Sequence, residues 1–121
     1  MRVLVCGGRG FNDRRRVFHA LDTLHAREAI TLLIEGGARG ADSLGHDWAV
    51  RNGIERRSFP ADWDRFGRSA GHRRNMQMLE EGCPELVVAF PGGSGTADMA
   101  LQAERADVPV WRPFKNIQVW S

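Results

Sequence analysis

Short apolar runs alternate along the chain with longer stretches in which apolar residues recur every three or four positions. The short runs predict buried strands, and the longer stretches predict amphipathic helices. Strands are expected at residues 2–6, 31–34, 54–59, 86–90 and 108–111. Helices are expected from Asn12 or Asp13, after Gly40, from about Ser69 to Glu81, and after the glycines that follow Phe90. Consecutive charged residues in the third run suit a strand at the edge of a sheet.

This regular alternation of strand and helix is typical of a parallel sheet that is covered on both faces. We therefore expect an α/β fold, a three-layer sandwich with a parallel sheet of about five strands and right-handed crossovers. No linker, internal repeat or low-complexity segment interrupts the chain, so residues 1–121 are expected to form a single domain. In the tail from Pro113 to Ser121, Val119 and Trp120 could pack either on the domain or on a partner.

Three glycine-rich segments each follow a predicted strand and precede a predicted helix. They are GGRGFND (Gly7 to Asp13), GGARGAD (Gly36 to Asp42) and PGGSGT (Pro91 to Thr96). Loops of this kind meet at the carboxyl edge of a parallel sheet, where ligands bind at the switch in strand order. The sequence therefore predicts a binding site at this edge.

The third segment, PGGSGT, predicts an anion site. Its glycines let backbone N–H groups turn toward a ligand, and the following helix adds its dipole. Ser94 and Thr96 can add hydroxyl donors. The alternative is a tight turn without a ligand, but we favour phosphate binding. The candidate contacts are Gly92, Gly93, Ser94, Gly95 and Thr96.

The first two segments carry weaker signals. GGRGFND lacks the third glycine of a dinucleotide fingerprint, and the chain contains no Walker motif. Asp42 is first of all a plausible helix N-cap or first-turn acid, and alternatively an acceptor for ribose hydroxyls. Additional candidate ligand contacts in these segments are Gly8, Arg9, Gly37 and Arg39.

The segment from residue 60 to residue 76 combines aromatic, basic and amide side chains. His72 and Asn75 lie on one helical face with apolar residues. They form either a buried hydrogen-bonded pair or, as we favour, a polar pocket wall at the carboxyl edge. Trp63 could stack on a base, although a loop tryptophan more often fills a small core.

Composition and charge favour a small anionic ligand. Neither a membrane span nor a signal peptide is present in the sequence, so a cytoplasmic protein is expected. The net charge of +2 is too small for sequence-independent binding along DNA. Arginine dominates the basic residues, which reflects either GC-rich codons or bidentate recognition of phosphate. Two cysteines suggest no disulfide framework, and Asp62 and Asp64 lack further metal ligands, so no metal or cofactor is expected.

Several segments taken together resemble the SLOG superfamily. They are GGARGAD, PADW (residues 60–63), GHRRNMQM (residues 71–78) and VVAFPGGSGTADM (residues 87–99). The chain is most similar to the small bacterial and phage branch called YspA-like or YAcAr, whose function is unknown, and the likeness runs from Arg2 to about Trp111. This resemblance implies a Rossmann-like fold that binds nucleotides or nucleotide-derived ligands. It also implies a homodimer, because relatives in the superfamily are commonly dimers.

The best-known members of the superfamily, the LOG enzymes, hydrolyse a nucleoside 5′-monophosphate to free base and ribose 5-phosphate. By matching position, Arg74 and Asp98 correspond to the catalytic arginine and first acid of the LOG pattern, whereas Met99 stands at its second glutamate. Cleavage of the glycosidic bond needs a carboxylate near the anomeric carbon. An acid other than Asp98 could supply this carboxylate. The candidates are Asp42, Asp62 and Glu104.

Three functions therefore follow from the sequence and the resemblance. The first is a module that binds a nucleotide or an ADP-ribose-type phosphorylated ligand without chemistry and could act as a sensor of it. The second is a LOG-like phosphoribohydrolase. The third is nucleic-acid binding through the arginines at residues 14–16 and 65–74, which we rank last because one domain of charge +2 lacks a long basic stripe.

Overall fold

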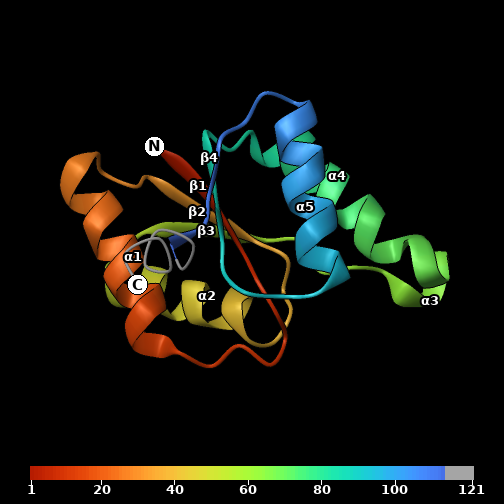
Figure 1. Cartoon of the computed structure of the whole chain (residues 1–121), viewed down its shortest axis with the longest axis horizontal. Coiled ribbons are helices and arrows are strands. Elements are labelled where there is room, and N and C mark those ends of the chain that lie inside the picture. The colour runs from red at the N-terminus through yellow and green to blue at the C-terminus, as the bar shows by residue number, and fades with distance from the viewer. Residues whose placement is uncertain (114–121) are drawn as a thin grey trace, which may run out of the picture.

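Five parallel strands form the centre of the computed structural model, in the order β3–β2–β1–β4–β5 (Figure 1). The strands are β1 (Arg2–Cys6), β2 (Leu32–Glu35), β3 (Glu55–Ser58), β4 (Leu86–Ala89) and β5 (Val110–Trp111). The structure describes residues 1–113, so Val119 and Trp120, which were considered as a contact with the domain or a partner, lie outside the described residues. The predicted five-stranded parallel sheet is confirmed, and the charged strand β3 lies at its edge.

The helices begin close to the predicted positions. They are α1 (Arg14–Arg27), α2 (Ala41–Arg51), α3 (Trp63–Phe66), the 3₁₀ turn η1 (Gly67–Ser69), α4 (Ala70–Gly82) and α5 (Ser94–Arg105). Asp13 caps α1, because its carboxylate accepts the N–H of Arg16 at 3.2 Å. The helix α3 was not predicted, because residues 60–68 precede the helix expected from about Ser69 and show no helical spacing of apolar residues. Asp62 caps this single turn by accepting the N–H of Arg65 at 3.1 Å.

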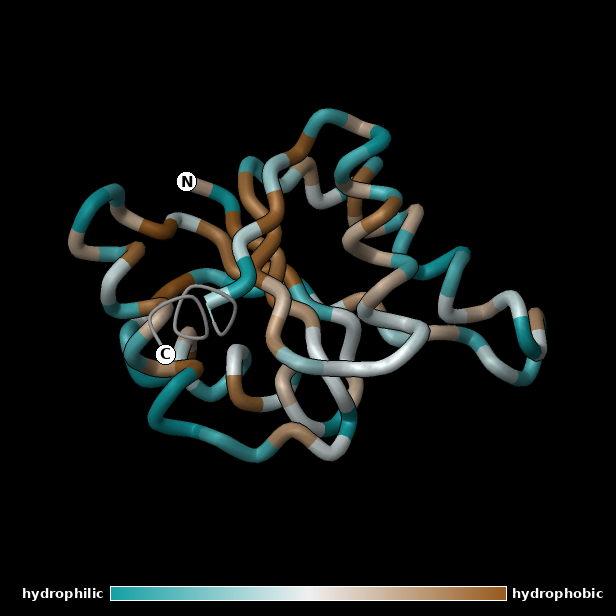
Figure 2. The backbone as a smooth tube through the Cα atoms, viewed as in Figure 1, coloured by the Kyte–Doolittle hydropathy of each residue, from teal (hydrophilic) through white to brown (hydrophobic). Residues whose placement is uncertain are grey.

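Side chains of the central strand β1 alternate between two hydrophobic layers. Val3 and Val5 pack with residues of α1 and α2, whereas Leu4 and Cys6 pack with residues of α4 and α5. In Figure 2 the hydrophobic positions concentrate along these central strands. The predicted three-layer sandwich, with helices on both faces of the sheet, is confirmed (Figure 1). Among residues 1–113, none of the helices has the length and apolar character that crossing a lipid bilayer demands.

The three glycine-rich loops lie against one another at the carboxyl edge of the sheet. The N–H of Gly8 donates to the carbonyl of Pro91 at 2.9 Å. A Cβ atom on Gly92 would lie 2.6 Å from that same nitrogen, and one on Gly40 would lie 2.1 Å from the carbonyl oxygen of Gly8. Gly40 also has a φ of 75°, which L residues with a side chain rarely adopt. Glycine at these positions therefore lets the loops pack together.

Candidate functional site

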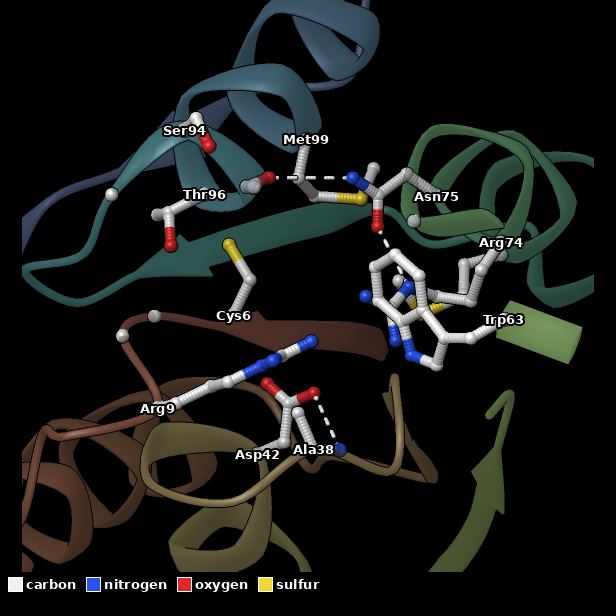
Figure 3. Close-up of a pocket in the computed structure, with 16 residues that line it drawn as sticks. Cys6, Arg9, Ala38, Asp42, Trp63, Arg74, Asn75, Ser94, Thr96 and Met99 are labelled. Atoms are coloured by element: carbon white, nitrogen blue, oxygen red, sulfur yellow. Dashed lines mark hydrogen bonds between the residues drawn. The ribbon is translucent and has the colours of Figure 1, made fainter. Parts of the chain in front are cut away.

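A cavity of about 460 Å³ opens at the carboxyl edge between β1 and β4 (Figure 3). The strand order changes direction at this point, since the chain continues from β1 to β2 on one side and from β4 to β5 on the other. Such a switch point is the usual ligand site of an open α/β sheet. Eight of the predicted site residues line this cavity: Gly8, Arg9, Asp42, Arg74, Gly93, Ser94, Gly95 and Thr96.

A second depression of about 320 Å³ adjoins the cavity. Gly37 and Arg39, two further predicted contacts, line this depression. Both hollows share the same four lining residues, which are Arg9, Ala38, Trp63 and Arg74. The remaining predicted residues, Gly92 and Asp98, line neither hollow. The structure thus brings most of the predicted contacts together and leaves two outside the lining.

The first turn of α5 forms one end of the cavity. Gly93 is its N-cap, and no side chain caps the helix. The N–H groups of the first turn have no partner within a helix, and the dipole adds partial positive charge there. Ser94 and Thr96 add hydroxyl groups to the same end of the lining. This end of the cavity therefore suits a phosphate group.

Asp42 supplies a buried carboxylate to the cavity. Gly40, not Asp42, is the N-cap of α2, and Asp42 lies in the first helical turn. Its carboxylate accepts the backbone N–H groups of Gly36 at 3.0 Å and Ala38 at 3.3 Å. Only 6% of the residue is exposed, and this burial raises the pKa of Asp42 to about 6. The group can accept a hydrogen bond when ionised and donate one when protonated.

Arg74 of α4 contacts the second glycine-rich loop. Its Nη1–H donates to the carbonyl oxygen of Gly36 at 2.6 Å, and its Nε–H donates to Oδ1 of Asn75 at 3.0 Å. Burial lowers the pKa of Arg74, and the nearby Asp42 opposes this shift. The guanidinium group is therefore held in place beside both hollows and brings positive charge to them.

Asp98 faces α4 instead of the cavity. Its carboxylate accepts hydrogen bonds from Nδ2 of Asn75 at 2.9 Å and Nε2 of Gln102 at 2.8 Å, and it lies 2.8 Å from Nδ1 of His72. Partial burial acts to raise the pKa of Asp98, but the hydrogen bonds from Asn75, His72 and Gln102 lower it below the usual value. Asp98 thus holds Asn75, which in turn accepts the hydrogen bond from Arg74.

The two residues that were predicted to form a polar pocket wall, His72 and Asn75, lie in different places. Asn75 is 3% exposed and lines the cavity, as the sequence analysis favoured. His72 instead lies against Asp98 and Gln102 of α5 and is not part of the lining. Helical spacing placed both residues on one face, but the packing of α5 on α4 determines which of them reaches the cavity.

Apolar residues that the sequence analysis did not assign complete the cavity wall. Cys6 ends β1, Met78 belongs to α4 and Met99 belongs to α5. All three line the cavity. Cys6 was recognisable as the last residue of its strand, and Met99 as the first buried position of its helix. Burial raises the pKa of Cys6 to about 12, which keeps its thiol protonated. Met99 presents an apolar side chain to the cavity at the position where the LOG pattern has its second glutamate.

Glu35 is a second buried acid near the site. It is the last residue of β2 and is 2% exposed. Its Oε2 lies 3.4 Å from Nδ1 of His46 and also accepts a hydrogen bond from the hydroxyl of Ser58. Its Oε1 accepts the N–H of Gly37 at 2.5 Å. Glu35 therefore helps to hold the second glycine-rich loop in place. Within residues 1–113, the His, Cys, Asp and Glu side chains form no group of three or more that could hold a metal ion.

Replacing Asp42 with asparagine is expected to flatten the dependence of stability on pH. The folded protein keeps the Asp42 proton to about pH 6, whereas an unfolded chain releases it near pH 4. Between pH 4 and pH 6 the folded state therefore binds more protons than the unfolded chain. As pH rises through this range, the Asp42 carboxyl lowers the free energy of unfolding. The shift corresponds to about 2 to 3 kcal/mol.

Urea unfolding of both proteins at pH 4 and pH 7 tests this expectation. The wild-type protein should lose about 2 to 3 kcal/mol more than the Asp42→Asn variant between the two pH values. Asp98 is present in both proteins, so the effect of its lowered pKa is the same in each and cancels from the difference. Identical pH dependence in the two proteins would show that Asp42 ionises normally in the folded state.

Comparisons with known proteins agree with this architecture. A family described as the YspA, cpYpsA-related SLOG family matches residues 1–66, which include the first two glycine-rich loops. The chain is also 37% identical over 119 residues to the "Gene 61 protein" of Mycobacterium phage D29. That alignment covers 90% of this chain and 93% of the phage protein. No solved structure matches the chain significantly.

Proposed function

The chain belongs to the YspA, cpYpsA-related SLOG family, and from this premise we propose that its cavity binds a nucleotide or a nucleotide-derived phosphorylated ligand. The single observation that carries the proposal is the meeting of an uncapped helix N-terminus and two arginines in one cavity at the switch point. A volume of about 460 Å³ lies in the usual range for small-molecule sites.

The charges along the cavity favour an anionic ligand. Arg9 and Arg74 line it, and within residues 1–113 Asp42 is the one acid among its lining residues. With its raised pKa, Asp42 carries less than a full negative charge near pH 6. The positive groups, together with the first turn of α5, favour a phosphate, while the Asp42 carboxyl offers a hydrogen-bond partner to sugar hydroxyls.

Isothermal titration calorimetry against a defined panel tests the proposal. The panel contains the 5′-monophosphates of adenosine, guanosine, cytidine and uridine, the four parent nucleosides, NAD, ADP-ribose and ribose 5-phosphate. At least one phosphorylated compound should bind with a Kd below about 1 mM, and at least tenfold more tightly than its unphosphorylated parent where the panel contains it. Failure of every phosphorylated compound to bind at millimolar concentration would refute the proposed function.

A second candidate function, hydrolysis of the N-glycosidic bond, is favoured by the position of Asp42. This buried carboxylate lines the cavity near Arg74, whereas Asp98 is held against α4, Asp62 caps α3, and Glu104 is an exposed residue 3.5 Å from Arg112. In the reaction the C1′–N bond breaks, a water oxygen bonds to C1′, and the base leaves with a proton. Asp42 would then stabilise the positive charge that develops on the sugar.

Mass spectrometry of the same nucleotide panel after incubation with the protein tests this second function. Free base and ribose 5-phosphate should appear with the wild-type protein and be lost with Asp42→Asn. Loss of products in Asp98→Ala alone would instead assign the chemistry to Asp98. An intact panel would exclude hydrolysis of these compounds and leave the binding function.

A further inference from the structure

Trp63 is a large aromatic residue with almost half of its surface exposed at the site. Its exposed fraction is 48%, whereas Trp48 is fully buried in the core. The residue therefore does not fill a small core, which was the more common expectation for a tryptophan in this segment. It lines both the cavity and the adjoining depression.

The local structure holds the indole ring without burying it. The carbonyl oxygen of Trp63 accepts the N–H of Gly67, which closes the single turn of α3. A Cβ atom on Gly71 of α4 would lie 3.4 Å from the ring, so the glycine leaves room for the indole to lie against this helix. The ring is thus supported on one side, while the rest of its surface remains available.

Within the protein, the indole ring of Trp63 interacts with the guanidinium group of Arg9. The Cζ atom of Arg9 lies 5.4 Å from the centroid of the Trp63 ring, within the range of a cation–π interaction. Across residues 1–113, no acidic side chain forms an ion pair with Arg9, and the indole N–H of Trp63 donates no hydrogen bond. Both partners are exposed, so a ligand can replace this contact at low cost.

Figure 3 shows Trp63 and the pair Ser94 and Thr96 on different sides of the same cavity. The first turn of α5 suits a phosphate, and the indole offers a flat aromatic surface. Asp42 lines the same cavity, and its carboxyl can form a hydrogen bond with a sugar hydroxyl. A ligand that satisfies all three features carries a phosphate, a hydroxylated sugar and an aromatic ring.

We propose that Trp63 is the residue on which the base of a nucleoside phosphate stacks, and that Arg9 moves from the indole to the phosphate when the ligand binds. This inference rests on the proposed function and narrows it. Sugar phosphates without a base leave the indole uncovered and are the poorer ligands. Trp63 thereby determines specificity for compounds with a base over compounds with a phosphate and sugar alone.

The test compares Trp63→Leu and Trp63→Phe with the wild-type protein. The probes are the four nucleoside 5′-monophosphates and ribose 5-phosphate, and the readout is the Kd from calorimetry. Phe66→Leu is the matched control, because Phe66 is also an aromatic residue of α3 but does not line the cavity. Circular dichroism and thermal unfolding establish that each variant is folded.

Trp63→Leu should weaken binding of the best nucleotide by about tenfold or more, in keeping with measured base–aromatic stacking. Trp63→Phe should fall between the leucine variant and the wild type. Binding of ribose 5-phosphate should change by about twofold or less. Phe66→Leu should bind every probe like the wild-type protein.

A fluorescence titration supplies a readout that a purely structural role would not move. The chain contains four tryptophans, and stacking of a base should quench the emission of Trp63. The nucleotide-dependent part of the quenching should disappear in Trp63→Leu and persist in Phe66→Leu.

Two results would overturn the stacking proposal while leaving the proposed function intact. One is unchanged nucleotide affinity in Trp63→Leu, and the other is an equal loss of affinity for nucleotides and ribose 5-phosphate. If the wild-type protein binds neither ribose 5-phosphate nor any nucleotide, the proposed function fails and the stacking proposal fails with it.

Discussion

Replacing Gly93 with valine is expected to abolish binding of phosphorylated ligands while the protein remains folded. Gly93 is the N-cap of α5 and lines the cavity at the end that suits a phosphate. A Cβ atom at this position meets no protein atom within 4 Å, so the side chain would occupy space that a ligand needs. The free energy of unfolding should change by about 1 kcal/mol or less, as for surface positions without tight contacts.

Gly10→Val is the matched control for this variant. A Cβ atom on Gly10 also meets nothing within 4 Å, but Gly10 does not line the cavity. The two variants should therefore unfold at similar urea concentrations, and only Gly93→Val should lose binding in calorimetry. Normal nucleotide affinity in a folded Gly93→Val protein would refute the assignment of this loop to phosphate.

Replacing Arg74 with alanine is expected to weaken binding of phosphorylated ligands by about 10- to 100-fold. A hydrogen bond to a charged group contributes about 1.5 to 3 kcal/mol, and each 1.4 kcal/mol corresponds to a factor of ten. Affinity for the unphosphorylated nucleoside should change much less, because it lacks the group that the guanidinium attracts. Calorimetry with a nucleotide and its parent nucleoside measures both effects.

The adjacent Arg73 provides the control for this experiment. Its Nε–H donates to the hydroxyl of Ser69 at 3.0 Å, and it lines neither hollow, so Arg73→Ala removes an equal charge without touching the cavity. Arg73→Ala should bind ligands almost normally. Equal losses of affinity for nucleotide and nucleoside in Arg74→Ala would assign a structural role to Arg74, through its hydrogen bonds to Gly36 and Asn75.

Local patterns in the sequence predicted most strands and helices, because the spacing of apolar residues indicates which positions face the core. The short apolar run at residues 2–6 predicted a buried strand, and the helical spacing in α1 placed Val17 and Leu21 inward. The short helix α3 was missed, since a single turn held by the cap Asp62 is too short to show a helical period.

The candidate site was only partly predictable, because long-range packing selects the side chains that reach it. The resemblance paired Arg74 with Asp98, but α4 and α5 pack so that Asn75 lies between these two residues. The spacing of residues in α4 could not separate Asn75, which lines the cavity, from His72, which contacts α5.

The sequence by itself determined the parallel α/β sandwich and the edge at which its glycine-rich loops meet. Both follow from the order of strands and helices and from the need to bury apolar faces. The sequence shows both the order of the elements and the positions of their apolar residues. Only the tertiary structure decided that Asp42 is buried and that Trp63 is exposed beside Arg9. Burial and side-chain direction depend on elements far apart in sequence, and their packing determines the environment of each group.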